Sequence, residues 1–123
     1  MAYQSLEELE VWKRACPLTV DLCKATADSR NYFIRDQMQR AALSIPSNIA
    51  EGSERDSKLD YIRFLRIAKG SAAELRTQCY IAARLEMLDH DQSTKFVKEC
   101  KEIASMLQGL IRALRNRQAA LET

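Results

Sequence analysis

The sequence predicts an all-α protein, a single antiparallel up-down-up-down four-helix bundle over residues 1–123. Apolar residues recur at steps of three and four along four segments, the spacing that places them on one face of an α-helix. The chain also holds only three glycines and two prolines, and short polar stretches separate the four segments. A chain of this length can bury a core of its own without cross-links.

The first predicted helix opens at Ser5, where Glu8 three residues later would complete a capping box. It runs to about Thr26. Pro17 lies inside it, removes one backbone donor, and is expected to kink the helix. The first turn is predicted at "ADSRN", residues 27–31.

The second predicted helix continues through Pro46, because its apolar rhythm does not stop there. A bent helix is therefore favoured over a loop, with a fresh helix capped by Ser44 as the alternative. Proline has no N–H, so the carbonyl of Ala42 needs a hydroxyl or a water instead. Gly52 is expected to end the helix in the left-handed conformation. The apolar positions are Ile34, Met38, Ala41, Ala42, Ile45 and Ile49.

The third predicted helix begins near Ser57, with Asp60 in its first turn, and runs to about Leu88. A second turn is expected at "DHDQS", residues 89–93, and the final "RNRQAALET" is expected to fray. The fourth helix has a heptad-like seam formed by Phe96, Cys100, Ile103, Leu107, Leu110 and Leu114.

Apolar residues also fall outside these core faces. A bundle this small cannot bury them alone, so the sequence predicts a stable homo-oligomer, with scattered surface hydrophobes as the alternative. On the third helix these residues are Leu59, Ile62, Ile67, Tyr80 and Leu85. On the first, Leu9, Cys16 and Val20 face away from Val11, Leu18 and Leu22.

The composition of the sequence predicts the cellular compartment of the protein. Residues 1–10 hold no basic or apolar signal region, and no apolar run approaches a membrane span, so neither secretion nor membrane insertion is expected. The four cysteines form no C-x-x-C pair and are expected to be buried, reduced thiols in a cytoplasmic protein. They are Cys16, Cys23, Cys79 and Cys100.

Polar residues gather on one arc of the second helix and beside the core arc of the third. Arg40 or Arg55 could pair with Glu51 or Glu74, and Asn48 could bridge backbone groups freed by Pro46. A network that fixes helix register or subunit contacts is expected. Acid–base or metal chemistry on the two glutamates is the alternative. The two arcs comprise Gln37, Arg40, Ser44, Ser47, Asn48 and Glu51, and Asp60, Ser71, Glu74 and Gln78.

Catalytic motifs are absent from the sequence. The one histidine, His90, lies in a predicted turn, and no nucleotide-binding glycine loop occurs. No enzyme activity, cofactor, metal or small-molecule substrate is therefore expected.

A basic stripe follows the third predicted helix with no acidic residue inside it. Such a stripe could track a phosphate backbone, and Tyr80 in the same arc could stack on a base. A solvated face that forms salt bridges is the alternative, since the net charge is only +2. The predicted nucleic-acid contacts are Arg55, Lys58, Arg66, Lys69, Arg76, Tyr80 and Arg84. Lys95, Lys98, Lys101, Arg112, Arg115 and Arg117 add positive charge on the fourth helix.

Two motifs, "QMQRAALSIPSNIAEGSER" and "FLRIAKGSAAELRTQ", carry a resemblance that extends from "LEVWKRA" to "MLQGLIRAL". The chain resembles the four-helix-bundle proteins encoded in intervening sequences of 23S ribosomal RNA genes. It is more distantly similar to accessory proteins of diversity-generating retroelements. The family-signature residues matched here are Arg40, Asn48, Glu51, Gly52, Arg55, Gly70, Ser71 and Glu74. The first turn lacks the usual Phe-Pro pair, and Phe33 stands where a glycine is common, which puts only local geometry in doubt.

The resemblance implies an antiparallel bundle assembled as a ring-like homopentamer, with a role related to RNA. Together with the basic stripe, it predicts a non-enzymatic, self-assembling bundle that binds RNA or a ribonucleoprotein partner. A purely structural or protein-interaction module without a nucleic-acid role is the alternative.

Overall fold

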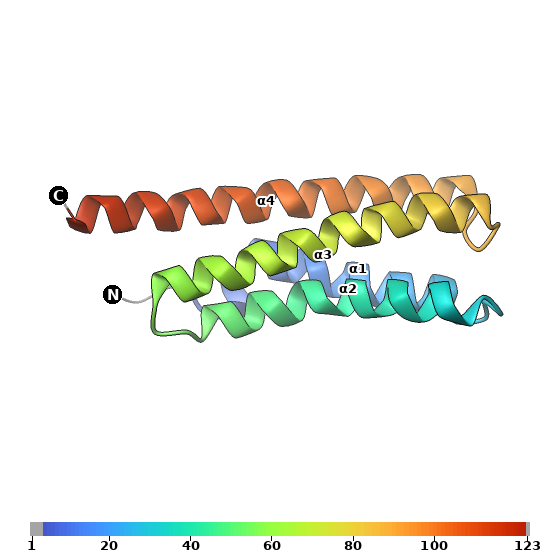
Figure 1. The fold of residues 1–123 in the computed structure, drawn as a ribbon, viewed down its shortest axis with the longest axis horizontal. Coiled ribbons are helices and arrows are strands. Elements are labelled where there is room, and N and C mark those ends of the chain that lie inside the picture. Colours follow the sequence, from blue (N-terminus) through green and yellow to red (C-terminus); the bar gives the residue numbers. More distant parts are fainter. Residues whose placement is uncertain (1–3, 123) are drawn as a thin grey trace.

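The computed structural model describes residues 4–122, and the side chains of residues 4–117. It confirms the all-α four-helix bundle. A 3₁₀ turn, η1 (Leu6–Glu8), is followed by α1 (Glu10–Thr26), α2 (Tyr32–Ser53), α3 (Lys58–Arg84) and α4 (His90–Glu122). Consecutive helices run in opposite directions, and α4 reaches beyond the other three at one end (Figure 1).

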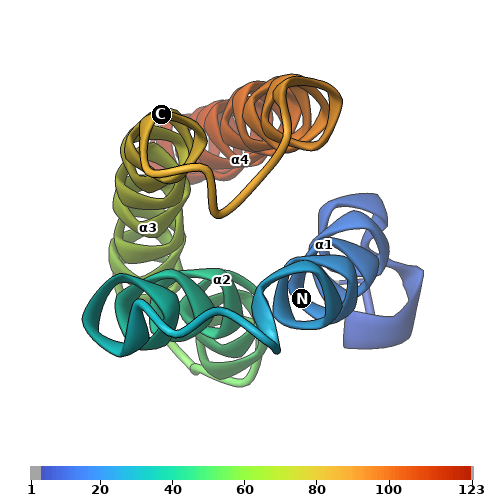
Figure 2. The ribbon, with the colours of Figure 1, turned by 90° about the vertical axis from the view of Figure 1, so that its right-hand side faces the viewer.

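The four helices follow one another around the bundle in chain order, as the end-on view in Figure 2 shows. The α2–α3 and α3–α4 pairs pack most extensively, and α1 lies mainly against α2. The α1–α4 pair touches least of the neighbouring helix pairs. The bundle is therefore tight on three sides and looser on the fourth.

The first helix starts later than predicted. The N-cap of α1 is Leu9, and the Ser5 side chain makes no capping hydrogen bond, so the predicted capping box is wrong. Leu9 is only 4% exposed. Burial of this leucine outweighs a local motif worth about 1 kcal/mol. The helix continues through Pro17.

The second helix passes through Pro46 without a break, which confirms the continuous helix and rules out a fresh helix capped by Ser44. The Thr19 hydroxyl of α1 lies 2.9 Å from the Ala42 carbonyl oxygen and 3.0 Å from the Ala15 carbonyl oxygen of its own helix, so its one proton is shared between these two acceptors. Ala42 is the residue whose carbonyl Pro46 leaves without a helical N–H. The predicted need for a hydroxyl is confirmed, and it is met from the neighbouring helix.

Gly52 does not serve as a left-handed stop. No glycine among the described residues has a positive φ, and α2 ends one residue later, at Ser53. A Cβ on Gly52 would lie 2.9 Å from the Phe64 Cβ and 3.0 Å from the Tyr61 Cδ1. The missing side chain lets α2 approach α3 closely, so the prediction of a conformational role was wrong.

The third helix begins as predicted, with the Ser57 hydroxyl accepting from the Asp60 backbone N–H at 3.3 Å. It ends at Arg84 rather than Leu88, and the turn that follows contains Glu86 at φ 61°. The predicted turn at residues 89–93 is wrong, because residues 90–93 already belong to α4.

A capping box explains why α4 starts early. The Asp89 carboxylate accepts from the Gln92 backbone N–H at 2.8 Å, and the Gln92 side-chain oxygen accepts from the Asp89 N–H at 3.1 Å. At its other end α4 continues to Glu122, through most of the segment predicted to fray. Thr123 lies outside the described residues.

The core differs from the predicted faces at several positions, among them Ile34, which is only partly buried. Ile111 is buried in place of Leu110, which is only partly buried. Leu9 and Ile62, both expected to face outward, are buried as well. Helical-wheel angles assign a residue to one face, whereas each helix here buries a wide arc between two neighbours. Other predicted outward residues are exposed, namely Val20, Leu59, Ile67, Tyr80 and Leu85.

The four cysteines are free thiols. Cys79 and Cys100 are buried, and their burial raises the pKa of each to about 12. Cys16 and Cys23 are only partly buried, so the predicted burial holds for two of the four. Within residues 4–122, no helix combines the length and apolar character needed to cross a membrane.

Candidate nucleic-acid interface

A polar cluster joins the middle of α2 to α3. The Ser44 and Ser71 hydroxyl oxygens lie 2.8 Å apart. The Asn48 side-chain amide donates to the Ser44 carbonyl at 2.8 Å and to its hydroxyl at 2.9 Å. Three of the predicted polar residues are thus brought together. Asn48 bonds the Ser44 carbonyl, however, and not the Ala42 carbonyl that Pro46 frees.

The ion pairs predicted for this region do not form. Within residues 4–117, Arg40, Glu51 and Glu74 take part in no salt bridge, and all three are exposed. Glu74 accepts a hydrogen bond from Gln78 at 3.3 Å. The Arg55 guanidinium lies 4.7 Å from the centroid of the Phe64 ring. The charged signature residues therefore face outward, while Ser71 and Gly52 are buried between the helices.

The residues of the predicted basic stripe do not all lie on one exposed face of α3. Arg55 lies in the α2–α3 loop, because α3 starts only at Lys58, so the wheel of α3 does not apply to it. The Lys58 Nζ is buried and has no hydrogen-bond partner in the described structure. Exposed stripe residues on α3 are Arg66, Arg76, Tyr80 and Arg84.

Two adjoining hollows lie between α3 and α4. The first, of about 350 Å³, is lined by Lys69 and Arg76 of α3 and by Lys101, Ala104, Ser105 and Gln108 of α4. The second, of about 370 Å³, is lined by Tyr80 and Ala83 of α3 and by His90, Ser93, Thr94, Val97, Lys98 and Lys101 of α4. Lys101 lines both, so the two hollows adjoin, and together they are called the α3/α4 groove. No carboxylate lines it.

Two hydrogen bonds join α3 and α4 along this groove. The Lys69 ammonium donates to the Gln108 side-chain oxygen at 2.8 Å. The Ser93 hydroxyl donates to the Cys79 carbonyl at 3.0 Å near the other end. These bonds bring lysines of α4 beside the α3 stripe. Sequence reasoning counted Lys98 and Lys101 only as added charge, because nothing local reveals which residues of another helix they face.

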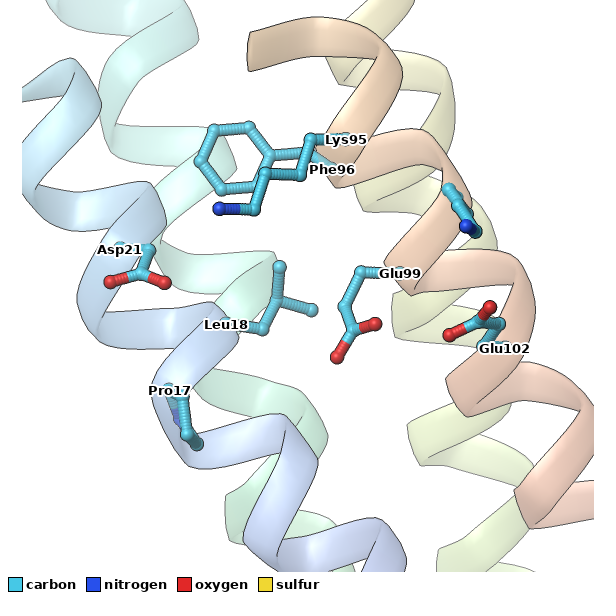
Figure 3. A pocket seen from close by; sticks show the side chains of 8 residues that line it. Pro17, Leu18, Asp21, Lys95, Phe96, Glu99 and Glu102 are labelled. Atoms are coloured by element: carbon cyan, nitrogen blue, oxygen red, sulfur yellow. The ribbon is translucent and has the colours of Figure 1, made fainter.

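The α1–α4 side holds a hollow of a different character. It has a volume of about 300 Å³ and is lined by Pro17, Leu18 and Asp21 of α1 and by Lys95, Phe96, Lys98, Glu99 and Glu102 of α4. In Figure 3 the Leu18 and Phe96 side chains and the Glu99 carboxylate extend into the space between the two helices. Three carboxylates make this hollow unsuitable for a polyanion.

An ion cluster closes part of that side. The Arg14 guanidinium of α1 binds the Glu99 carboxylate, with an Nε to Oε2 distance of 3.0 Å, and it also binds Glu102. The hydrogen bond from Arg14 lowers the pKa of Glu102 below its usual value. The hydrogen bonds to Glu99 and Glu102 raise the pKa of Arg14. Sequence reasoning missed this role of Arg14; the two glutamates three residues apart were the available signal.

The alternative prediction was a metal or acid–base site on Glu51 and Glu74. Within the described part of the chain, no group of three or more His, Cys, Asp or Glu side chains is placed to hold a metal ion. His90 is exposed at the first position of α4, where it lines the α3/α4 groove.

The 23S rRNA-intervening sequence protein family matches residues 7–109. A comparison with curated proteins finds no match. Among solved structures, the chain is similar to a protein with unknown function from the S23 ribosomal protein family of Bacteroides thetaiotaomicron VPI-5482. The two share 23% sequence identity over 82% of this chain and 97% of the other, with a TM-score of 0.77. That likeness supports the fold, and the family match covers most of the sequence. This chain therefore belongs to the 23S rRNA-intervening sequence protein family.

Proposed function

We propose that this protein is a non-enzymatic RNA-binding bundle that contacts the phosphate backbone through the α3/α4 groove. The observation that carries the proposal is the lining of the groove. Four cationic side chains, Lys69, Arg76, Lys98 and Lys101, line two adjoining hollows that contain no carboxylate. Clustered cations of this kind bind a polyanion by releasing its counterions.

The family description, which names an intervening sequence of 23S rRNA, favours RNA as the polyanion. The proposal also places the protein in the cytoplasm, where its four free cysteines would remain reduced. A ribonucleoprotein partner would meet the same groove through its RNA.

Charge reversal tests the proposal. The variants Arg76→Glu and Lys101→Glu should each weaken RNA binding, measured by fluorescence anisotropy over a range of salt concentrations. Removing one cation that touches a phosphate should also reduce the salt slope by about 0.7 to 0.9. Arg66→Glu should weaken binding less, because Arg66 lines neither hollow. Arg30→Glu, in the exposed α1–α2 turn, is the matched control.

Two results would overturn this function. The first is the absence of RNA binding at low salt. The second is binding that does not weaken as salt rises, or that the control variant weakens as much as Arg76→Glu. The first result would leave the competing interpretation, a structural or protein-interaction module, and the second would show that RNA binds without the cations of the groove.

We also propose that copies of the chain associate through the exposed side of α2 and α3. At 100° per residue, Ile67, Glu74, Ile81 and Leu85 fall within an arc of α3 about 40° wide. Ile67, Ile81 and Leu85 are large, exposed hydrophobic residues. Ser71 borders this arc, and its contact with Ser44 places the arc next to α2.

The matching side of α2 offers complementary groups. Arg40 and Glu51 lie within about 40° of Ser44 on the α2 wheel, and Leu43, which is 57% exposed, lies about 60° beyond Arg40. The face as a whole therefore combines apolar residues with one cation and two carboxylates that form no salt bridge in the described structure. A face with both signs of charge can complement a second copy of itself.

Sedimentation tests the assembly. Micromolar protein should sediment as a multiple of 14.1 kDa, and the family resemblance implies five copies. Leu43→Lys and Ile67→Lys should reduce the mass, whereas Val20→Lys on α1 should not. A 14.1 kDa species for the unmodified chain would rule the assembly out.

A further inference from the structure

We infer that the α3/α4 groove selects single-stranded nucleic acid, with a phosphate between Lys69, Arg76 and Lys101 and an unpaired base on Tyr80. This inference rests on the proposed RNA-binding function and adds the kind of strand that the groove accepts. Cations line both hollows, but an aromatic side chain lines only the second, so the two can hold different parts of a nucleotide.

The first hollow suits a phosphate group. Three cations from two helices line it, together with the Ser105 hydroxyl and the Gln108 amide. Lys69 is held by the neutral Gln108 oxygen at 2.8 Å, so its charge is positioned without being neutralised. Within residues 4–117, none of the three cations belongs to a salt bridge. An anion that enters this hollow meets their full charge.

The second hollow suits a base. The Tyr80 side chain is 53% exposed, and the apolar Ala83 and Val97 line the same hollow. An exposed aromatic ring stacks on any base, because every base presents a flat π-face. The Ser93 hydroxyl donates to the Cys79 carbonyl, which leaves Thr94, His90, Lys98 and Lys101 as lining groups that can hydrogen bond to a base edge.

The phosphate contact and the base contact lie close together along α3. Tyr80 lies one helical turn beyond Arg76, roughly 6 Å along α3. Lys101 lines both hollows from the opposite helix. A base and the phosphate next to it can therefore occupy them together.

A duplex cannot use the second hollow in this way. Its bases are paired and stacked on one another, so a base must first leave the stack, at a cost of a few kcal/mol. Single strands have no such cost. The groove should therefore prefer single strands, with Tyr80 responsible for the preference.

The test compares one labelled RNA oligonucleotide, alone and annealed to its complement, by fluorescence anisotropy. The single strand should bind more tightly. Tyr80→Ala should weaken single-strand binding between about 5-fold and 150-fold and leave duplex binding unchanged. Tyr80→Phe should retain most of the affinity, because the ring remains. Tyr32→Ala, which removes an exposed tyrosine from α2, is the control and should have no effect.

The outcomes separate this inference from the function on which it rests. Equal affinity for both forms, or a Tyr80→Ala variant that binds single strands normally, overturns the strand preference. Salt-dependent binding that Arg76→Glu still abolishes would then leave the proposed function intact. Failure of both forms to bind at low salt overturns the function as well. A single-stranded DNA of the same sequence shows whether the ribose contributes; equal affinity for it supports recognition by phosphate and base alone.

Discussion

Pro46 and Gly52 affect the packing of α2 because Pro46 has no backbone N–H and Gly52 has no Cβ. Pro46 has no N–H, so the Ala42 carbonyl takes its hydrogen bond from Thr19 of α1. Gly52 has no Cβ, so α2 can lie against Phe64 and Tyr61 of α3. The sequence predicts that Ala42 needs a donor, but the donor lies on another helix and only the fold reveals it. For Gly52 the sequence suggests a helix stop, because a close approach of two helices leaves no local signal.

Removal of the Thr19 hydroxyl should therefore be costly. Thr19→Val keeps the shape of the side chain but leaves the Ala42 carbonyl without a partner, which should destabilise the protein by about 1 to 3 kcal/mol in chemical denaturation. Thr77→Val is the matched control, since the Thr77 hydroxyl bonds only its own helix, at Ala73, and is exposed. In a Pro46→Ala background, which restores the N–H, the cost of Thr19→Val should shrink. An unchanged cost there would contradict this assignment.

Alanine substitutions at the glycines should have opposite signs. Gly52→Ala should lower the free energy of unfolding by about 1 kcal/mol, because its Cβ overlaps Phe64. Gly109→Ala meets no atom within 4 Å. It should raise stability by about 0.5 to 1 kcal/mol, since alanine favours the helix. Equal effects of the two substitutions on the midpoint of denaturation would show that the Gly52 contact is unimportant.

At the scale of elements, a local capping motif decides where α4 starts, whereas burial of a side chain decides where α1 starts. Asp89 and Gln92 form a reciprocal capping box that starts α4, and the D-x-x-Q spacing was visible in the sequence. Ser5 and Glu8 offer a similar spacing, yet α1 starts after Leu9, which is buried. Helix type and order follow from the apolar period. Helix ends follow from it less well, because tertiary burial competes with motifs of about 1 kcal/mol.

The attachment of α1 to α4 should depend on pH. Arg14 lowers the pKa of Glu102 below its ordinary value of 4.5. A depressed carboxyl pKa contributes stability that is complete above the unfolded pKa and is lost as pH falls through the folded pKa. Arg14→Met should therefore melt at a lower temperature than the unmodified protein at neutral pH, and the difference should narrow as the pH falls below 4.5 and Glu102 becomes protonated. Lys13→Met, which removes an exposed pair with Glu10, is the control. A constant difference across this range would contradict the link.

At the scale of the whole molecule, the α3/α4 groove is a product of helix register. The sequence predicts a basic stripe on α3, and four of its members, Arg66, Arg76, Tyr80 and Arg84, are exposed there. It does not reveal that Lys98 and Lys101 of α4 lie beside Arg76 and Tyr80, because the packing of buried residues from both helices decides how they align. A helical wheel shows which residues share a face of one helix, but it does not show which residues of a second helix lie beside them.

The most direct measurement is ultraviolet cross-linking of the full-length protein to RNA, followed by mass spectrometry of the cross-linked peptides. If RNA lies in the α3/α4 groove, cross-links should fall on Tyr80 and on residues 93–108, and they should disappear at high salt. Cross-links confined to α1 and α2 under conditions in which RNA is bound would contradict the account.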